Sequence, residues 1–203
     1  MKKMIDRVGI CLLIAAFFWC GTLISDRQRL NRELIRLHIV AASDGAEDQA
    51  RKLRVRDAVT QSLQSDLQKL TDAEQARAYL QEKLPDIQQV ATRTLQNLGC
   101  QDSVRVSLCK EAFDTRVYDT FSLPSGVYQA LRIVIGEGQG HNWWCVVFPG
   151  LCVPAASEGF ADTAAGAGFP DGLNQALQGQ QGYELRFGVL DALGKLENIL
   201  FAG

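Results

Sequence analysis

The chain has 203 residues, which is enough for one compact domain and a short additional segment. Hydrophobic residues make up 47% and charged residues 22%, a balance that excludes a disordered, collagenous or coiled-coil protein. The 21 basic and 23 acidic residues leave a net charge of -2, so we expect no nucleic-acid partner. The only two histidines, His38 and His141, exclude most multi-histidine metal sites.

Residues 1–26 have the pattern of an export signal or membrane anchor. Lys2, Lys3 and Arg7 precede an apolar run of 17 residues, 8–24. That length is at the short limit for crossing a hydrocarbon layer of roughly 30 Å. Basic residues before such a run predict that the N-terminus stays in the cytoplasm and that the following segment is exported. No A-x-A cleavage site ends the run, so the segment fits either a cleaved signal or a retained anchor. The alternative is a buried core helix.

A strand and three helices are expected next. Apolar and polar residues alternate over Ile35–Ala41, which predicts a half-buried strand. Asp44 and Glu47 have the spacing of a capping box, which indicates the start of a long helix. Pro85 is expected to end a second helix and to open a third.

The hydrophobic period then changes from about 3.6 to 2, which predicts three strands. Residues 104–108 and 127–135 alternate, whereas 143–148 is apolar on both faces and so belongs inside the sheet or beneath another element. We therefore expect 34–153 to be a single α+β domain with the order β-α-α-α-β-β-β. It should contain a mixed sheet of about four strands with helices packed on one face.

The C-terminal part changes composition. Residues 154–182 are rich in Ala, Gly and Gln without an apolar period, which predicts a flexible linker. Residues 183–201 are expected to form an amphipathic helix. Its apolar face would dock on its own domain, on a membrane surface or on a partner.

Four cysteines, Cys100, Cys109, Cys145 and Cys152, lie in the part expected to be exported, where oxidation is possible. Four cysteines allow three pairings, and the sequence does not choose among them. The short separation between Cys145 and Cys152 favours that pair, with buried free thiols as the alternative.

Catalytic motifs are weak in this sequence. The glycine run 136–140 is followed by a strand instead of a helix, so we interpret it as a hairpin turn and not as a phosphate loop. A secreted hydrolase that uses Cys145 or Ser43 with a histidine is the alternative to a binding protein. Ser43 is already explained by helix capping, and Cys145 shares a strand face with Trp143. We expect no catalytic residue, no metal, no cofactor and no small-molecule substrate.

The sequence gives a better indication of a protein interface. Trp143 and Trp144 are adjacent, and tryptophan is a frequent anchor in protein–protein interfaces. The alternative is that both belong to the core. The polar residues expected around them are Asn142, His38, Asp44 and Arg56.

Several segments resemble the stage II sporulation protein R family. They are Leu37–Asp44 (LHIVAASD), Asp48–Gln49, Val55–Asp57 (VRD), Leu123–Arg132 (LPSGVYQALR) and Ile135–Cys152 (IGEGQGHNWWCVVFPGLC). The resemblance implies export from the forespore into the space between the two sporulation membranes. There the protein would activate a membrane-embedded aspartic peptidase of the mother cell, which processes the pro-protein of sigma factor E. On this resemblance the chain activates a protease without being one.

Overall fold

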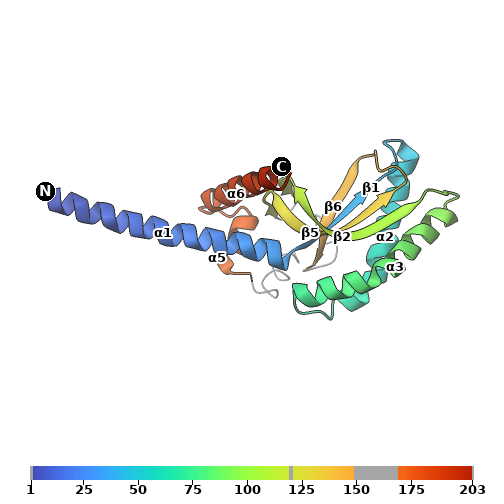
Figure 1. Ribbon diagram of the computed structural model, residues 1–203, viewed down its shortest axis with the longest axis horizontal. Helices are drawn as coiled ribbons and strands as arrows, with labels where there is room; N and C mark the ends of the chain where they lie inside the picture. Colours follow the sequence, from blue (N-terminus) through green and yellow to red (C-terminus); the bar gives the residue numbers. More distant parts are fainter. Residues whose placement is uncertain (1, 119–120, 149–168, 203) are drawn as a thin grey trace.

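One four-stranded sheet lies between two layers of helices in the computed structural model, which describes residues 2–118, 121–148 and 169–202 (Figure 1). The helices are α1 (Lys2–Glu33), α2 (Ala46–Leu67), α3 (Ala73–Asn97), α5 (Asp171–Leu177) and α6 (Glu184–Ala202). The strands are β1 (Ile35–Val40), β2 (Val104–Phe113), β3 (Arg116–Val117), β4 (Ser122–Leu123), β5 (Gly126–Ile135) and β6 (Asn142–Phe148). The predicted α+β class is confirmed.

The sheet is mixed, with the strand order β2-β5-β1-β6. The central strands β1 and β5 are parallel, and each has an antiparallel neighbour on its other side. All six residues of β1 are buried, because helices cover this strand from both faces. A separate two-stranded ladder joins β3 and β4 and follows β2 in the chain.

Helices α2 and α3 cover one face of the sheet, where they form an apolar core with β1 and β5. Helix α3 runs without interruption from Ala73 to Asn97, so the predicted break at Pro85 is wrong. Its buried residues Leu80, Ile87 and Ala91 keep a helical period across the proline. Pro85 itself is exposed, where water can satisfy the carbonyl group that loses its hydrogen bond.

The other face of the sheet is covered by the end of α1 together with α5 and α6. This second layer was not expected from the sequence. Helix α5 forms inside the predicted linker, because Phe169, Leu173 and Leu177 recur every four residues and are all buried. Residues 154–168 of that predicted linker lie outside the described part of the chain. The predicted C-terminal helix is confirmed as α6.

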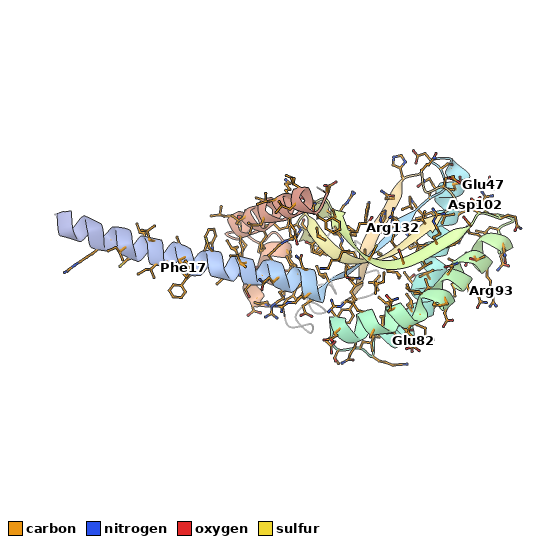
Figure 2. The ribbon with its side chains drawn as sticks, in the orientation of Figure 1. Phe17, Glu47, Glu82, Arg93, Asp102 and Arg132 are labelled. Carbon is orange, nitrogen blue, oxygen red and sulfur yellow. The ribbon has the colours of Figure 1, made fainter. Side chains whose placement is uncertain are left out.

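Helix α1 contains one stretch, Arg7–Glu33, that is long and apolar enough to cross a membrane. Its most apolar part has a mean hydropathy of 2.2 and is almost entirely unburied. Phe17, for example, points away from the helix and is 77% exposed (Figure 2). Leu23, Leu30 and Leu34 are buried in the second layer, so the helix passes from an unburied apolar half into the folded domain.

Candidate docking site at the edge of the sheet

Strand β6 directs its two tryptophans to opposite faces of the sheet, because successive side chains of a strand alternate. Trp143 faces the α2–α3 layer, where the guanidinium carbon of Arg56 lies 4.3 Å from its ring centroid. Its indole N–H is buried and has no hydrogen-bond partner within the described residues. Trp144 faces the second layer. The two tryptophans therefore do not form one anchor.

Trp144 lies on a stack of supporting side chains. The ring of His38 is parallel to the indole within 16°, and the ring centroids are 3.7 Å apart. His38 Nδ1 lies 2.8 and 2.9 Å from the two carboxylate oxygens of Glu111, which can only accept, so Nδ1 carries the proton. The Arg132 guanidinium lies 3.7 Å from the same carboxylate. His38 is only 4% exposed, so it supports Trp144 from below and does not lie at the expected polar rim.

Asp44 connects the start of α2 to the β5–β6 loop. The predicted capping box with Glu47 is wrong: Gly45 is the N-cap of α2, and no side chain caps the helix. Asp44 Oδ1 instead accepts from the backbone N–H of His141 at 2.6 Å and lies 2.5 Å from Nδ1 of the same histidine. The carboxylate therefore holds the loop next to α2.

Backbone contacts fix the same loop from beneath. The Gly140 N–H donates to the Ala41 carbonyl at 3.0 Å, and a Cβ at Gly140 would lie 2.2 Å from the Ser43 carbonyl oxygen. Only glycine fits at this close approach. The buried Lys52 Nζ donates to the His141 carbonyl at 2.9 Å, and burial lowers the pKa of Lys52. These contacts hold the loop next to β1 and α2.

A hollow of about 390 Å³, here called the Trp144 pocket, lies between these loops and Trp144. The guanidinium carbon of Arg116 lies 5.2 Å from the Trp144 centroid. Arg116 Nε is buried and has no hydrogen-bond partner within the described residues. A cation beside an aromatic wall and two amides suits a carboxylate or a peptide carbonyl of a partner. The pocket is lined by Asp44, Arg116, Gln139, Gly140, His141, Asn142 and Trp144.

The structure separates the residues that were expected to form one surface. Trp144, Asn142 and Asp44 line the pocket, whereas Trp143 and Arg56 meet on the opposite face of the sheet. Arg116 was not identified from the sequence, since the two-residue strand β3 that carries it has no recognisable pattern.

The described residues do not bring a nucleophile to a base. Cys145 is disulfide-bonded, and Cys152, its predicted partner, lies outside the described residues. The Ser43 hydroxyl donates to an Asp48 carboxylate oxygen at 2.6 Å and not to a histidine. In the same part of the chain, no three His, Cys, Asp or Glu side chains are placed to hold a metal ion.

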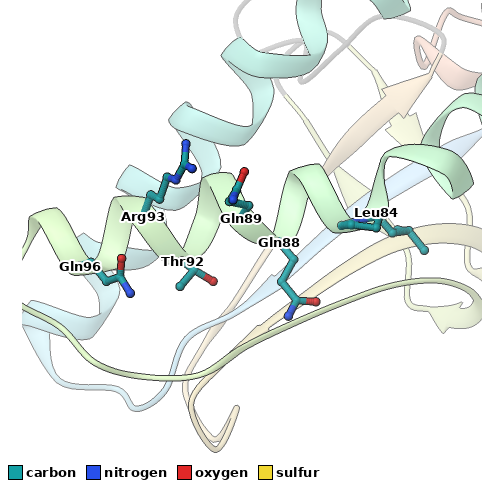
Figure 3. A pocket seen from close by; sticks show the side chains of 7 residues that line it. Leu84, Gln88, Gln89, Thr92, Arg93 and Gln96 are labelled. Carbon is teal, nitrogen blue, oxygen red and sulfur yellow. The ribbon is translucent and has the colours of Figure 1, made fainter.

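A second hollow, of about 520 Å³, follows the outer side of α3 (Figure 3). Its polar lining consists mainly of amides, with Arg93 as the one charged side chain among its lining residues. Amides without a titratable partner offer hydrogen bonds but no acid–base chemistry. The Trp144 pocket is therefore the better candidate site.

The region that contains this pocket also matches known proteins. Residues 31–158 match the profile of the Stage II sporulation protein R family. The chain belongs to that family. Stage II sporulation protein R of Bacillus subtilis (strain 168) is 40% identical over 129 residues, which cover 64% of this chain and 58% of the relative. No solved structure matches the chain.

The part shared with the stage II sporulation protein R family runs from the end of α1 to beyond β6. Every residue that lines the Trp144 pocket lies within it. The apolar half of α1 and the whole of α6 lie outside the matched residues.

Proposed function

We propose that this chain is an exported signalling protein of sporulation that activates a membrane-embedded aspartic peptidase. It would leave the forespore, reach the space between the two sporulation membranes and bind the peptidase of the mother-cell membrane. The activated peptidase would then process the pro-protein of sigma factor E. Family membership supports the sporulation role, and the apolar half of α1 supports export.

The Trp144 pocket is the observation that carries the activator role. It combines an aromatic wall, an arginine without an ion pair within the described residues and a loop held at several points. A preformed surface of this kind loses little conformational entropy on binding. An activator also needs a higher affinity for the active arrangement of its target than for the inactive one, and a rigid pocket can supply that difference.

The hydrolase alternative has little support from these contacts. A disulfide-bonded sulfur is not a thiolate nucleophile, and Cys145 is disulfide-bonded. Ser43 lacks a hydrogen bond to a histidine within the described residues. We therefore assign no catalytic role to either residue.

The test is co-expression of the full chain with a cognate peptidase and the sigma pro-protein in a host that does not sporulate. Shortening of the pro-protein on a blot is the readout. We expect it to require this chain, to persist in Ser43→Ala, and to fall strongly in Trp144→Ala. Loss of an interface tryptophan typically removes about 2 kcal/mol or more of binding free energy.

Matched variants separate binding from folding. Arg116→Glu should abolish shortening, whereas Arg105→Glu, an exposed charge reversal on β2, should leave it unchanged. Circular dichroism of the purified variants checks that each is folded. Absence of shortening with the wild-type chain would contradict the activator role. Normal shortening with folded Trp144→Ala and Arg116→Glu would contradict the assignment of the pocket only.

A further inference from the structure

Helix α1 enters its own domain before its apolar run ends. The run of 17 residues, 8–24, is about 26 Å long as a helix, whereas a hydrocarbon layer is roughly 30 Å thick. Because the run is no longer than the layer, its last residues lie at the boundary of the layer. Leu23 is one of them, yet it is 2% exposed and belongs to the second-layer core. The part of the domain that covers Leu23 therefore lies at the level of this boundary.

Helices α5 and α6 both start close to α1 at this level. Asp26, three residues after Leu23, accepts a hydrogen bond from Arg186 Nε at 2.9 Å. A Cβ added at Gly172 of α5 would lie 3.2 Å from Arg186 Nη1 and 3.8 Å from a ring carbon of Tyr183. Figure 1 shows α5 and the start of α6 beside the middle of α1, beyond which the apolar half of α1 continues alone.

From this point α6 leads away from the apolar run. Asn31, near the end of α1, donates to Glu197, near the end of α6, at 2.9 Å. Residues 178–183, here called the α5–α6 turn, join the two helices and precede the residue that pairs with Asp26. The turn therefore lies at the end of α6 that is nearest to the apolar run.

The α5–α6 turn and the first residues of α6 have a composition that suits the headgroup layer of a bilayer. The turn begins with glutamines and glycines (QGQQG), whose amides form hydrogen bonds without a charge. Tyr183 follows, and tyrosine is enriched at membrane interfaces. Glu184, the one charged residue of 178–185, accepts from the Gly182 N–H at 2.9 Å, which holds its carboxylate against the turn. Leu185 is 67% exposed.

We propose that the α5–α6 turn, together with Leu185, lies in the headgroup layer of the bilayer that α1 crosses. The bilayer is the partner that the apolar run of α1 brings to the level of this turn. A single spanning helix leaves a domain free to tilt, because tilt is set by packing and by residues anchored at the interface. The turn would be a second point of contact and would restrict the orientation of the domain above the membrane.

The experiment uses the full chain in vesicles of phosphatidylethanolamine and phosphatidylglycerol. The photoreactive residue p-benzoylphenylalanine replaces Tyr183 or Leu185 in two test variants. In the matched control it replaces Leu200, which is 75% exposed near the other end of α6, roughly 22 Å from position 185 along the helix. A positive control places it at Leu13, which is exposed within the apolar run. After irradiation, mass spectrometry measures the fraction of chain that carries one phospholipid.

We expect several-fold more phospholipid adduct at positions 183 and 185 than at position 200, and strong labelling at position 13. Adduct levels at 183 and 185 no higher than at 200 would overturn the proposal, whether or not position 13 is labelled. Recovery of the chain only in a shortened form that lacks the apolar run would also overturn it. Circular dichroism of each variant checks that it is folded. The peptidase is absent from this experiment, so its result is independent of the proposed function.

Discussion

The two faces of the sheet are covered by helices in chemically different ways. The α2–α3 face is built mainly from apolar side chains, and Lys52 on α2 is the one buried charged residue of this layer among the described residues. The opposite face, beneath α1, α5 and α6, is also apolar at its centre but encloses charged side chains. Asp26, Arg27, Arg36 and His38 are each less than a tenth exposed there.

This difference indicates that the two layers are stabilised in different ways. Apolar packing stabilises the α2–α3 layer without requiring particular partners. The second layer depends on specific pairs that join distant parts of the chain, such as Arg27 with Glu197 and Asp26 with Arg186. Because a buried charge is costly without its partner, these pairs fix how α6 and α1 sit on the sheet. The Trp144 pocket also opens on this second face.

The largest effect is expected in the α2–α3 layer. Leu80 on α3 is fully buried, and Leu80→Ala should lower the free energy of unfolding by about 3 kcal/mol, because it leaves a cavity. Urea denaturation of the purified chain measures this change. Leu98→Ala, at an exposed position, is the matched control and should have little effect. A decrease in the free energy of unfolding no larger than that of the control would mean that this layer is loosely packed.

The second-largest effect on stability is expected at the ion pair between α6 and α1. Arg186→Met removes the partner of Asp26, whose side chain is 5% exposed. Because the Arg186 side chain is itself 21% exposed, its loss should lower the free energy of unfolding by about 2 to 3 kcal/mol, less than the loss of a partner in a fully buried pair. The same urea experiment, with Lys83→Met on the exposed pair to Asp86 as control, tests this prediction. Equal effects of the two substitutions would contradict the role of the buried pair.

A pH dependence of similar or smaller size is expected at Asp191. Burial opposes its ionisation, but hydrogen bonds from Thr115, Ser125 and Lys195 outweigh burial and lower its pKa from 3.8 to about 2. A lowered folded-state pKa stabilises the fold above pH 4, and this stabilisation disappears as the pH falls towards 2. The shift corresponds to about 2 kcal/mol.

Comparison with Asp191→Asn isolates this contribution. The wild type should exceed the variant in free energy of unfolding at pH 6, and the difference should shrink between pH 4 and pH 2. Urea denaturation at stepped pH values measures both proteins under the same conditions. A difference that stays constant over this range would show that the carboxylate does not titrate as proposed.

The sequence predicted the elements of the first layer better than those of the second. The alternation over β1, β2 and β5 and the apolar stripes of α2 and α3 are local patterns, and each was visible in the sequence. The break predicted at Pro85 is wrong because proline was taken to end the helix, although the buried apolar stripe of α3 continues beyond it. Helix α5 was missed although Phe169, Leu173 and Leu177 have helical spacing, because composition was given more weight than period.

Only part of the site was predicted, because local patterns in the sequence do not show contacts between distant residues. Adjacent tryptophans on a strand were identified, and alternation alone places them on opposite faces. The contacts that build the pocket join residues far apart in the chain: His38 with Glu111, Asp44 with His141, and Arg116 with Trp144. Such pairs depend on tertiary structure, and no spacing in the sequence reveals them.

The smallest effect on stability is expected at Arg36. Its substitution tests whether every buried charge of the second layer stabilises the fold. Arg36 is fully buried, and its Nε and Nη1 atoms have no hydrogen-bond partner within the described residues. Its guanidinium carbon lies 4.0 Å from the Phe113 centroid, and Nη2 lies 3.2 Å from the Tyr118 hydroxyl. Replacing a poorly satisfied buried charge by an apolar side chain of similar length is often neutral or stabilising.

We therefore expect Arg36→Met to change the free energy of unfolding by less than about 1 kcal/mol, or to raise it. Arg27→Met is the matched control, since Arg27 is buried but bonded to both Glu197 and Tyr128. That variant should be clearly destabilised, because it removes a satisfied pair. Urea denaturation compares the two directly. A loss at Arg36 as large as at Arg27 would mean that the aromatic contacts of Arg36 stabilise the fold as strongly as an ion pair. A neutral result would show that the second layer contains a cation that stability does not require.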